Sequence, residues 1–261
     1  MEFRVLGALD IRSGGSRLDL GGLTRRAVLG YLLLHDNQAV AASRIQTALW
    51  PDRPPPTARK IVQNAVSAIR KTLAHGDSEL ERAVLLTENP GYRLRVDPNA
   101  VDLNRFRRLA EQGRTAVQAG AAEPGRERLR AAVGMWSGTA LADLVEAGID
   151  WSELTALEDE RLNVHEDCLE AELAVGRHRE ITPELEMLTA TAPLREGFHR
   201  QYMLALYRSG RQAEALRVYH RSRAVLVEHL GIEPGRELRL LHRLILAQDS
   251  CLQSRQFRPT A

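Results

Sequence analysis

Hydrophobic positions recur at helical spacing along residues 57–73, and every charged residue in this stretch is basic. One half of a helical wheel, drawn at about 100° per residue, holds Ala58, Ile61, Val62, Ala65, Val66, Ala68, Ile69 and Leu73. The other half holds Thr57, Arg59, Lys60, Gln63, Asn64, Ser67, Arg70 and Lys71, and only Thr72 interrupts the apolar side. The pattern predicts an amphipathic helix that packs its apolar side on a core, with Thr57 as candidate N-cap after a run of prolines.

The polar side of this helix contains no carboxylate, and the nearest acids in the chain are Asp52 and Asp77. A solvated surface helix usually mixes acidic with basic residues, because oppositely charged pairs four residues apart stabilise it. Two interpretations stay open from this helix alone: an ordinary solvated face, or a face that meets an anionic partner. The absence of any acid favours the anionic partner.

The elements around this helix indicate which anion it meets. Residues 2–20 alternate imperfectly around Gly14-Gly15, which predicts a β-hairpin. Helices are expected at residues 23–36, with Arg25 and Arg26 in the first turn, and at residues 41–50, before Pro51. Residues 84–96 read strand, turn at Asn89-Pro90-Gly91, strand. Three helices with a basic third one and a closing hairpin predict a winged helix-turn-helix, whose third helix enters the DNA major groove.

From about residue 97 onward the pattern is helical throughout. Residues 102–120 and 124–136 are expected to form one helical pair, and more helices are expected from Trp151 to about Leu246. Gly176-Arg177 and Gly210-Arg211 lie 34 residues apart, which is the tetratricopeptide repeat spacing. We therefore predict a mainly α fold with small β-hairpins: a winged helix-turn-helix in residues 1–96, an all-α tetratricopeptide-like domain in residues 97–250, and a mobile tail in residues 251–261.

Charge is distributed unevenly between these regions. Residues 1–96 hold 14 Lys and Arg against 9 Asp and Glu, a net charge of +5, whereas residues 97–261 hold 22 against 25, a net charge of −3. Hydrophobic content of 44% is sufficient for real cores. No apolar run of about 18 residues and no signal peptide is evident, and Cys168 and Cys251 form no disulfide framework. These features predict a soluble, cytoplasmic protein with no membrane association.

Candidate catalytic chemistry is absent from the sequence. His165, Glu166, Asp167 and Cys168 are metal-capable types, but consecutive residues of a helix point in different directions. No phosphate-binding glycine loop, nucleophile elbow or paired-carboxylate site stands out. We predict no enzyme, cofactor or metal; Trp50, Trp136 and Trp151 are expected core anchors, and Tyr92 is expected to pack within the hairpin.

Four stretches resemble the SARP family, the pathway-specific activators of antibiotic biosynthesis in actinomycetes. They are "LTRRAVLGYLLL", "ALWPDRPPPTARKIVQNAVSAIRKTL", "NPGYRLRV" and "HLGIEPGREL". The last, with "GMWSGTALADL" before it, is similar to that family's bacterial transcriptional activation domain, and the winged helix is similar to the output domain of OmpR-type response regulators. The resemblance covers about residues 1–250. It departs at Ala68, where many relatives carry a basic residue, which places more of the base readout on Asn64.

The resemblance implies a transcription activator that binds direct repeats beside a promoter's −35 element. Tandem protomers on double-stranded DNA would recruit RNA polymerase holoenzyme through its primary sigma factor, which also implies association with the nucleoid. The candidate DNA-binding residues are Arg25, Arg26, Thr57, Arg59, Lys60, Gln63, Asn64, Ser67, Arg70, Lys71 and Arg93.

Individual roles within that set follow from side-chain chemistry. Asn64 is suited to reading adenine bidentately, the alternative being a solvated residue. Lys60, Arg70 and Lys71 are expected at phosphates, which take most protein–DNA hydrogen bonds. Arg93 can reach the minor groove or pair with a carboxylate such as Glu88. The alternative for the whole chain is a tetratricopeptide-like protein-binding adaptor without specific DNA binding.

Overall fold

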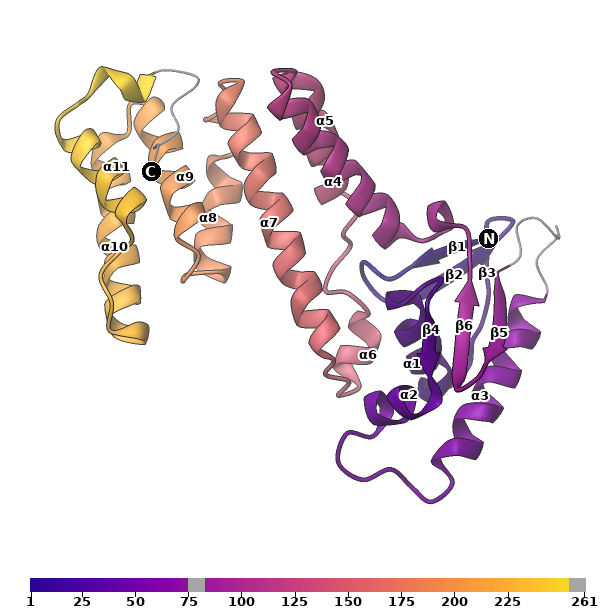
Figure 1. The fold of residues 1–261 in the computed structure, drawn as a ribbon. Helices are drawn as coiled ribbons and strands as arrows, with labels where there is room; N and C mark the ends of the chain where they lie inside the picture. Colours follow the sequence, from indigo (N-terminus) through magenta and orange to yellow (C-terminus); the bar gives the residue numbers. More distant parts are fainter. Residues whose placement is uncertain (75–82, 254–261) are drawn as a thin grey trace. The chain divides into compact units, whose positions relative to one another are not determined.

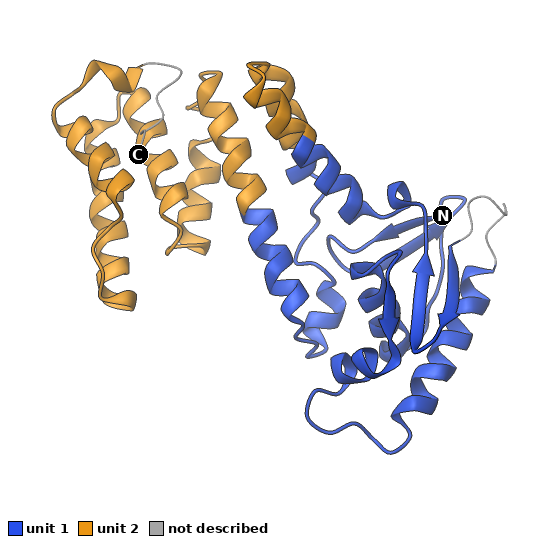
Figure 2. Cartoon of the chain, viewed as in Figure 1, with its two compact units in different colours: residues 1–111, 131–162 blue, residues 112–130, 163–261 orange. Residues whose placement is uncertain are grey.

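The computed structural model describes residues 1–74 and 83–253 of the chain. Their contacts divide into two compact units, which Figure 2 colours separately. Unit 1 comprises residues 1–111 and 131–162, and unit 2 comprises residues 112–130 together with the described chain from residue 163 onward. The helices α4, α5 and α7 each contribute residues to both units. Packing thus assigns to the first unit two segments that lie beyond the boundary expected at residue 96.

Unit 1 begins with a three-stranded antiparallel sheet in the order β1-β2-β3. Its strands are β1 (Glu2–Arg4), β2 (Asp10–Ser13) and β3 (Ser16–Arg17). Gly14 and Gly15 connect the last two strands with φ of +55° and +83°. Positive φ at both central residues is what a two-residue hairpin turn of type I′ requires, so the hairpin predicted at Gly14-Gly15 is confirmed.

Three helices follow and form the core of unit 1: α1 (Leu23–Leu34), α2 (Ala42–Leu49) and α3 (Ala58–Leu73), shown in Figure 1. Helix α1 carries seven consecutive buried residues, from Ala27 to Leu33, and contacts both other helices. Ile45 of α2 and Val62 and Ile69 of α3 are at most 1% exposed. One helix buried on several sides, with two amphipathic helices packed on it, gives the helix-turn-helix that the sequence predicts.

A second sheet, in the order β4-β6-β5, contains the predicted closing hairpin. Its strands are β4 (Ala39–Ala41), β5 (Val84–Glu88) and β6 (Gly91–Arg95), and Tyr92 is buried between its neighbours. Gly91 starts β6 where a Cβ atom would lie 1.8 Å from the carbonyl oxygen of Val40, so only glycine allows this pairing. Strand β4 was not anticipated, because three residues are too few to show alternation.

Two carboxylates from beyond residue 96 attach to the N-terminal sheet within unit 1. Asp102 begins α4 (Asp102–Gln118), and its carboxylate accepts the backbone N–H of Val5 at 2.9 Å. Burial raises the pKa of Asp102 and outweighs the hydrogen bonds from the backbone, which act to lower it. Asp143 lies in α6 (Ala142–Glu146) and accepts the N–H of Leu9 at 2.7 Å. Side chains distant in sequence therefore satisfy backbone donors of the winged domain.

The three tryptophans take different positions in unit 1. Trp151, which is 4% exposed, precedes α7 (Ser152–Ala174) and donates its indole N–H to the carbonyl of Ala48 in α2 at 2.9 Å. Trp136 is half-buried, with its ring edge-to-face on Phe106 at 5.4 Å between centroids. Trp50 is half-buried at the C-cap of α2. Trp151 is thus a core anchor as predicted, whereas the other two are only partly enclosed.

Unit 2 consists of paired helices. It takes the end of α4 with α5 (Ala122–Val133), the second half of α7, and then α8 (Thr182–Thr191), α9 (Glu196–Arg208), α10 (Gln212–Leu230), α11 (Arg236–Leu246) and the 3-10 turn η3 (Ser250–Gln253). Gly176 follows α7 and Gly210 joins α9 to α10, with φ of +87° and +78°. The glycines of the 34-residue period therefore occupy helix-to-helix turns, as predicted. Leu252 of η3 is fully buried, so unit 2 takes in the start of the expected tail, and residues 254–261 lie outside the described chain.

None of the described helices has the length and apolar character needed to traverse a bilayer.

Candidate nucleic-acid interface

The two sides of α3 differ in burial as the helical wheel predicts. Its buried residues are Ala58, Val62, Ala65, Val66, Ile69 and Leu73. Its exposed residues are Arg59, Lys60, Gln63, Asn64, Ser67, Arg70 and Lys71, and Ala68 lies between the two sets. The exposed face presents only cationic and hydrogen-bonding side chains, because no acid lies within the helix. An α-helix with such a face has the size and chemistry to enter a major groove.

Cations at the two ends of α3 have different environments. Arg59 and Lys60 make no hydrogen bond or ion pair with a residue in the described ranges, and they lie in the first turn, where the helix dipole opposes positive charge. A phosphate at the same end would reverse that unfavourable balance. Arg70 and Lys71 lie in the last turn, where the helix dipole favours them. Thr57 occupies the predicted N-cap position and is exposed, but its side chain makes no capping hydrogen bond.

Arg70 connects α3 to the hairpin. Its Nε donates to the carbonyl oxygen of Leu85 at 2.7 Å, and its Nη2 donates to Oγ1 of Thr87 at 2.7 Å. Both acceptors belong to β5, so one guanidinium fixes the distance between α3 and the first strand of the β5–β6 hairpin, which is the wing of this fold. Sequence alone indicated a phosphate contact for Arg70 and gave no sign of this link.

Arg93 forms the ion pair that was the alternative to DNA contact. Its guanidinium lies 2.8 Å from the Glu88 carboxylate, across the hairpin from β6 to β5, and both side chains are more than a third exposed. A solvent-exposed pair of this kind contributes little to stability and exchanges partners readily. Arg93 stays a candidate for DNA contact only if a phosphate replaces Glu88.

The two arginines at the start of α1 also differ. Arg25 is exposed, with its guanidinium close to Gly21. Arg26 lies 2.6 Å from the Asp143 carboxylate and donates to the carbonyl oxygen of Leu9 at 2.8 Å. Arg26 thus holds α1, α6 and the N-terminal segment together, and Arg25 is the better placed of the two for a DNA backbone.

A polar cluster that the sequence did not reveal links α1, α2 and α7 within unit 1. Arg44 of α2 donates to the hydroxyl of Tyr31 at 2.8 Å and to the carboxylate of Glu153 at 3.1 Å. His35 lies 3.3 Å from the same carboxylate. Burial acts to raise the pKa of Glu153, but hydrogen bonds from its own backbone, Tyr31, Ser152 and Arg44 outweigh burial and lower it. The cluster fixes α2, the first helix of the helix-turn-helix pair, against the start of α7.

Across residues 1–74 and 83–253 there is no cluster of three or more His, Cys, Asp and Glu side chains that could hold a metal ion. Cys168 is fully buried, and burial raises the pKa of its thiol to about 12. The thiol is therefore a packed, unreactive group.

Known proteins with similar sequences are regulators of transcription or carry the name of regulatory proteins. The profile of the bacterial transcriptional activator domain matches residues 101–246. The transcriptional regulatory protein MoaR1 of Mycobacterium tuberculosis is 37% identical over 249 residues, which cover 95% of this chain and 80% of MoaR1. The regulatory protein DnrI of Streptomyces peucetius is 37% identical over 254 residues, which cover 95% of this chain and 93% of DnrI.

A solved structure has the same fold. Mycobacterium tuberculosis EmbR, in complex with a low-affinity phosphopeptide, superimposes with a TM-score of 0.88 at 36% identity. The match covers 95% of this chain and 65% of the EmbR chain, so this chain spans about two thirds of that protein. MoaR1, DnrI and EmbR are all named as regulatory proteins and not as enzymes, which confirms the prediction of a non-enzymatic regulator. With a winged helix-turn-helix before a bacterial transcriptional activator domain, and with relatives such as DnrI similar along almost their whole length, the chain belongs to the SARP family of transcriptional regulators.

Proposed function

We propose that the protein is a sequence-specific DNA-binding activator of transcription, in which α3 enters the major groove and the β5–β6 hairpin lies beside the duplex. The exposed face of α3 carries this proposal, because it combines four cations with amide and hydroxyl groups and contains no acid. Cations supply affinity for phosphates, and Gln, Asn and Ser side chains supply donors and acceptors for base edges. The family membership supports a role in transcription.

The finer parts of the proposal come from the family resemblance. The binding sites would be direct repeats near the −35 element, occupied by tandem protomers that recruit RNA polymerase holoenzyme through its primary sigma factor. The regulated genes would be those of a secondary-metabolite pathway, such as antibiotic biosynthesis. Within the chain, residues 1–96 would contain the DNA-binding domain and the helical region after them the activation function.

DNA affinity measured as a function of salt tests the electrostatic part. If about six phosphates are neutralised per protomer, the association constant falls by about 10³ between 50 and 200 mM salt. Arg59→Ala should lower affinity for all sequences and reduce the salt slope by about 1, since Arg59 is exposed on α3 and has no described partner in the chain. Arg128→Ala is the matched control, because Arg128 is an exposed arginine of α5 in unit 2.

Footprinting on promoter DNA from around the chain's own gene tests specificity. Protection of paired direct repeats, with transcription from that promoter rising in a reconstituted reaction, is the expected result. If fluorescence anisotropy shows no association with any DNA duplex at low salt, the proposal is wrong. The alternative of a tetratricopeptide-like adaptor that binds proteins would then be favoured. A chain ending at Val96 that still activates would overturn the division of roles between the two regions.

A further inference from the structure

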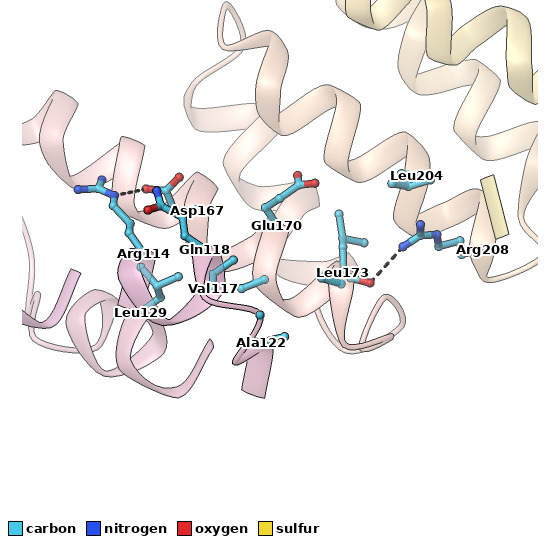
Figure 3. A pocket seen from close by; sticks show the side chains of 13 residues that line it. Arg114, Val117, Gln118, Ala122, Leu129, Asp167, Glu170, Leu173, Leu204 and Arg208 are labelled. Atoms are coloured by element: carbon cyan, nitrogen blue, oxygen red, sulfur yellow. Dashed lines mark hydrogen bonds and ion pairs between the residues drawn. The ribbon is translucent and has the colours of Figure 1, made fainter. Parts of the chain in front are cut away.

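Unit 2 contains a hollow of about 740 Å³ between α4, α5, α7 and α9, shown in Figure 3. Val117, Leu129, Ala171 and Leu204 supply an apolar lining from all four helices. This volume is in the range of sites that hold small ligands or side chains of a bound peptide. An apolar lining of this kind gains free energy when an apolar group displaces water from it.

The charged groups at the border of this hollow already have partners. Arg114 and Asp167 form an ion pair at 2.6 Å, and Arg208 donates to the carbonyl oxygen of Leu173 at 3.1 Å, as Figure 3 shows. Glu170 accepts from the guanidinium of Arg200 at 2.7 Å. Because these charged groups already have partners within the chain, they are not expected to bind an ion from solution.

A second hollow of about 450 Å³ adjoins the first, and Arg114, Asp167 and Glu170 line both. Glu166 also lines it, and its half-buried carboxylate has no hydrogen bond or ion pair among residues with described placement. Burial raises the pKa of Glu166. The positive charges of Arg200 and Arg195 act to lower it, and the carboxylates of Asp167 and Glu170 act to raise it. These two arginines donate to Glu170 and Asn163 instead, so a cationic donor at this point would meet a carboxylate that no described residue hydrogen-bonds.

Gln201 supplies a second acceptor in the same wall. It is fully buried, and its Nε2 donates to the backbone carbonyl of Glu166 at 2.8 Å and to the Glu170 carboxylate at 3.2 Å. These two bonds orient the side-chain amide, whereas its Oε1 is buried with no hydrogen-bond partner. An unpartnered buried acceptor is costly to the fold and indicates a donor that the chain does not provide.

The position of the Glu166 carboxylate depends on a glycine in α9. A Cβ atom on Gly197 would lie 1.9 Å from Oε1 of Glu166, so the carboxylate occupies the space that the glycine leaves. Any side chain at residue 197 would displace it. Gly197 therefore offers a way to move this acceptor without removing its charge.

We propose that the two joined hollows bind a peptide segment of a partner protein that presents an Arg or Lys side chain next to an apolar one. The basic group donates to Glu166 and Gln201, and the apolar side chain enters the larger hollow against Val117, Leu129 and Leu204. The negative charge of Glu166 favours a basic side chain in the peptide. The adjoining apolar lining favours an apolar side chain at the next position of the peptide. Concave surfaces of stacked helical pairs are suited to such segments. The site is independent of DNA binding, so failure of either proposal leaves the other intact.

Peptide titration of the full chain tests the site. A fluorescein-labelled peptide of Gly and Ser with one Phe and one nearby Arg should bind saturably. Citrulline in place of Arg keeps the shape but removes the charge and should weaken binding about tenfold. Ala in place of Phe should weaken it by a similar factor, because the apolar contact is lost. These two changes leave the protein untouched, so they do not depend on whether a variant folds.

Three protein variants sharpen the test. Glu166→Gln should weaken the Arg peptide about tenfold and leave the citrulline peptide unchanged. Gly197→Ala should weaken the Arg peptide as well, by displacing the carboxylate. Glu228→Gln is the matched control, because Glu228 is an exposed acid of α10 and should leave all affinities unchanged. Circular dichroism confirms that each variant keeps its helices.

Several outcomes would overturn the proposal. Equal affinity of Glu166→Gln and the unchanged protein, or preference for an acidic peptide, would refute the assigned chemistry. If the peptide binds only a chain ending at Gln253, the occupant is the chain's own C-terminal segment and not a partner. If Glu166→Gln abolishes concentration-dependent self-association in analytical ultracentrifugation but not peptide binding, the occupant is a second copy.

Discussion

Arginine side chains have opposite environments in helix α3 of unit 1 and in the helical pairs of unit 2. On α3, Arg59 is exposed and the described chain offers it no carboxylate. In unit 2, Arg126 and Arg130 converge on Glu172, which is 3% exposed, at 3.6 and 2.9 Å. A cation whose counter-ion lies within the chain stabilises the fold, and one without a counter-ion is available to an external anion. Pairing is therefore more informative about function than the number of positive charges.

The largest effect should come from breaking the buried charges of unit 2. Glu172→Ala leaves Arg126 and Arg130 without a shared carboxylate, and removing one partner of a buried ion pair costs about 3–5 kcal/mol. The free energy of unfolding from urea titration should fall by about that amount. DNA affinity of the folded fraction should not change, since α3 belongs to the other unit.

Glu180→Gln is the control for that change. Glu180 pairs with Arg177 at the border of the same network, but its side chain is 59% exposed, so stability should hardly change. Equal loss of stability in both variants would show that burial does not decide the contribution of these pairs.

A pH effect in unit 2 should be nearly as large. Burial acts to raise the pKa of Glu184, but hydrogen bonds from His165 and Arg130 and their positive charges outweigh burial and lower the pKa to about 2. Because the folded pKa lies below the ordinary value of 4.5, the stabilisation is complete above about pH 4.5 and is lost as pH falls towards 2. The shift corresponds to about 3 kcal/mol.

Unfolding free energies measured from pH 6 down to pH 2 check this expectation. Glu184→Gln should show a smaller loss in acid than the unchanged chain, because it has no carboxyl group to protonate. Parallel acid profiles for the two proteins would contradict the lowered pKa.

Local patterns were sufficient for α3 and for the hairpins. The alternation of Val62, Ile69 and the other buried residues with the basic face depends only on helical geometry, and Gly14-Gly15 specifies its own turn. The exposure of the polar side chains of α3 could be predicted for the same reason. What a pattern of spacing cannot show is which distant residue a side chain contacts.

Several side chains in unit 1 contact residues that are far away in the sequence, and these contacts could not be predicted from local patterns. Arg26 finds Asp143 from 117 residues away, and Trp151 reaches Ala48 from 103 residues away. Strand β4 forms because β6 is present beside it, and its three residues carry no signal of their own. These contacts also explain why unit 1 includes residues 131–162, which composition and periodicity assign to the helical region.

A smaller effect is expected at Asn64, the residue of α3 that we propose to read a base. Asn64→Ala should cost about 1–3 kcal/mol in binding to the specific site and relax the preference at one base pair. Asn64 is exposed in the middle of the acid-free face, where an amide can pair with adenine. Competition assays with a set of single-base operator variants measure the preference directly.

Asn163→Ala is the matched control, since Asn163 is an exposed asparagine of α7 in unit 2. If Asn64→Ala weakens random and specific DNA to the same extent, the residue contributes to general affinity and not to base recognition.

The smallest effect distinguishes the two roles open to Arg70. Thr87→Val removes the hydroxyl that accepts from the Arg70 guanidinium and leaves the second bond, to the Leu85 carbonyl, in place. A single hydrogen bond contributes about 1 kcal/mol, so the stability of unit 1 and the affinity for DNA should both fall by about that amount or less.

If Arg70 acts mainly through the wing, Arg70→Ala and Thr87→Val should be non-additive, with a coupling of at least about 0.5 kcal/mol in a double-mutant cycle of DNA binding. If Arg70 contacts a phosphate instead, Thr87→Val should leave DNA affinity unchanged, and Arg70→Ala alone should reduce the salt slope by about 1. The position of the wing relative to α3 would then depend on the sheet and not on this side chain.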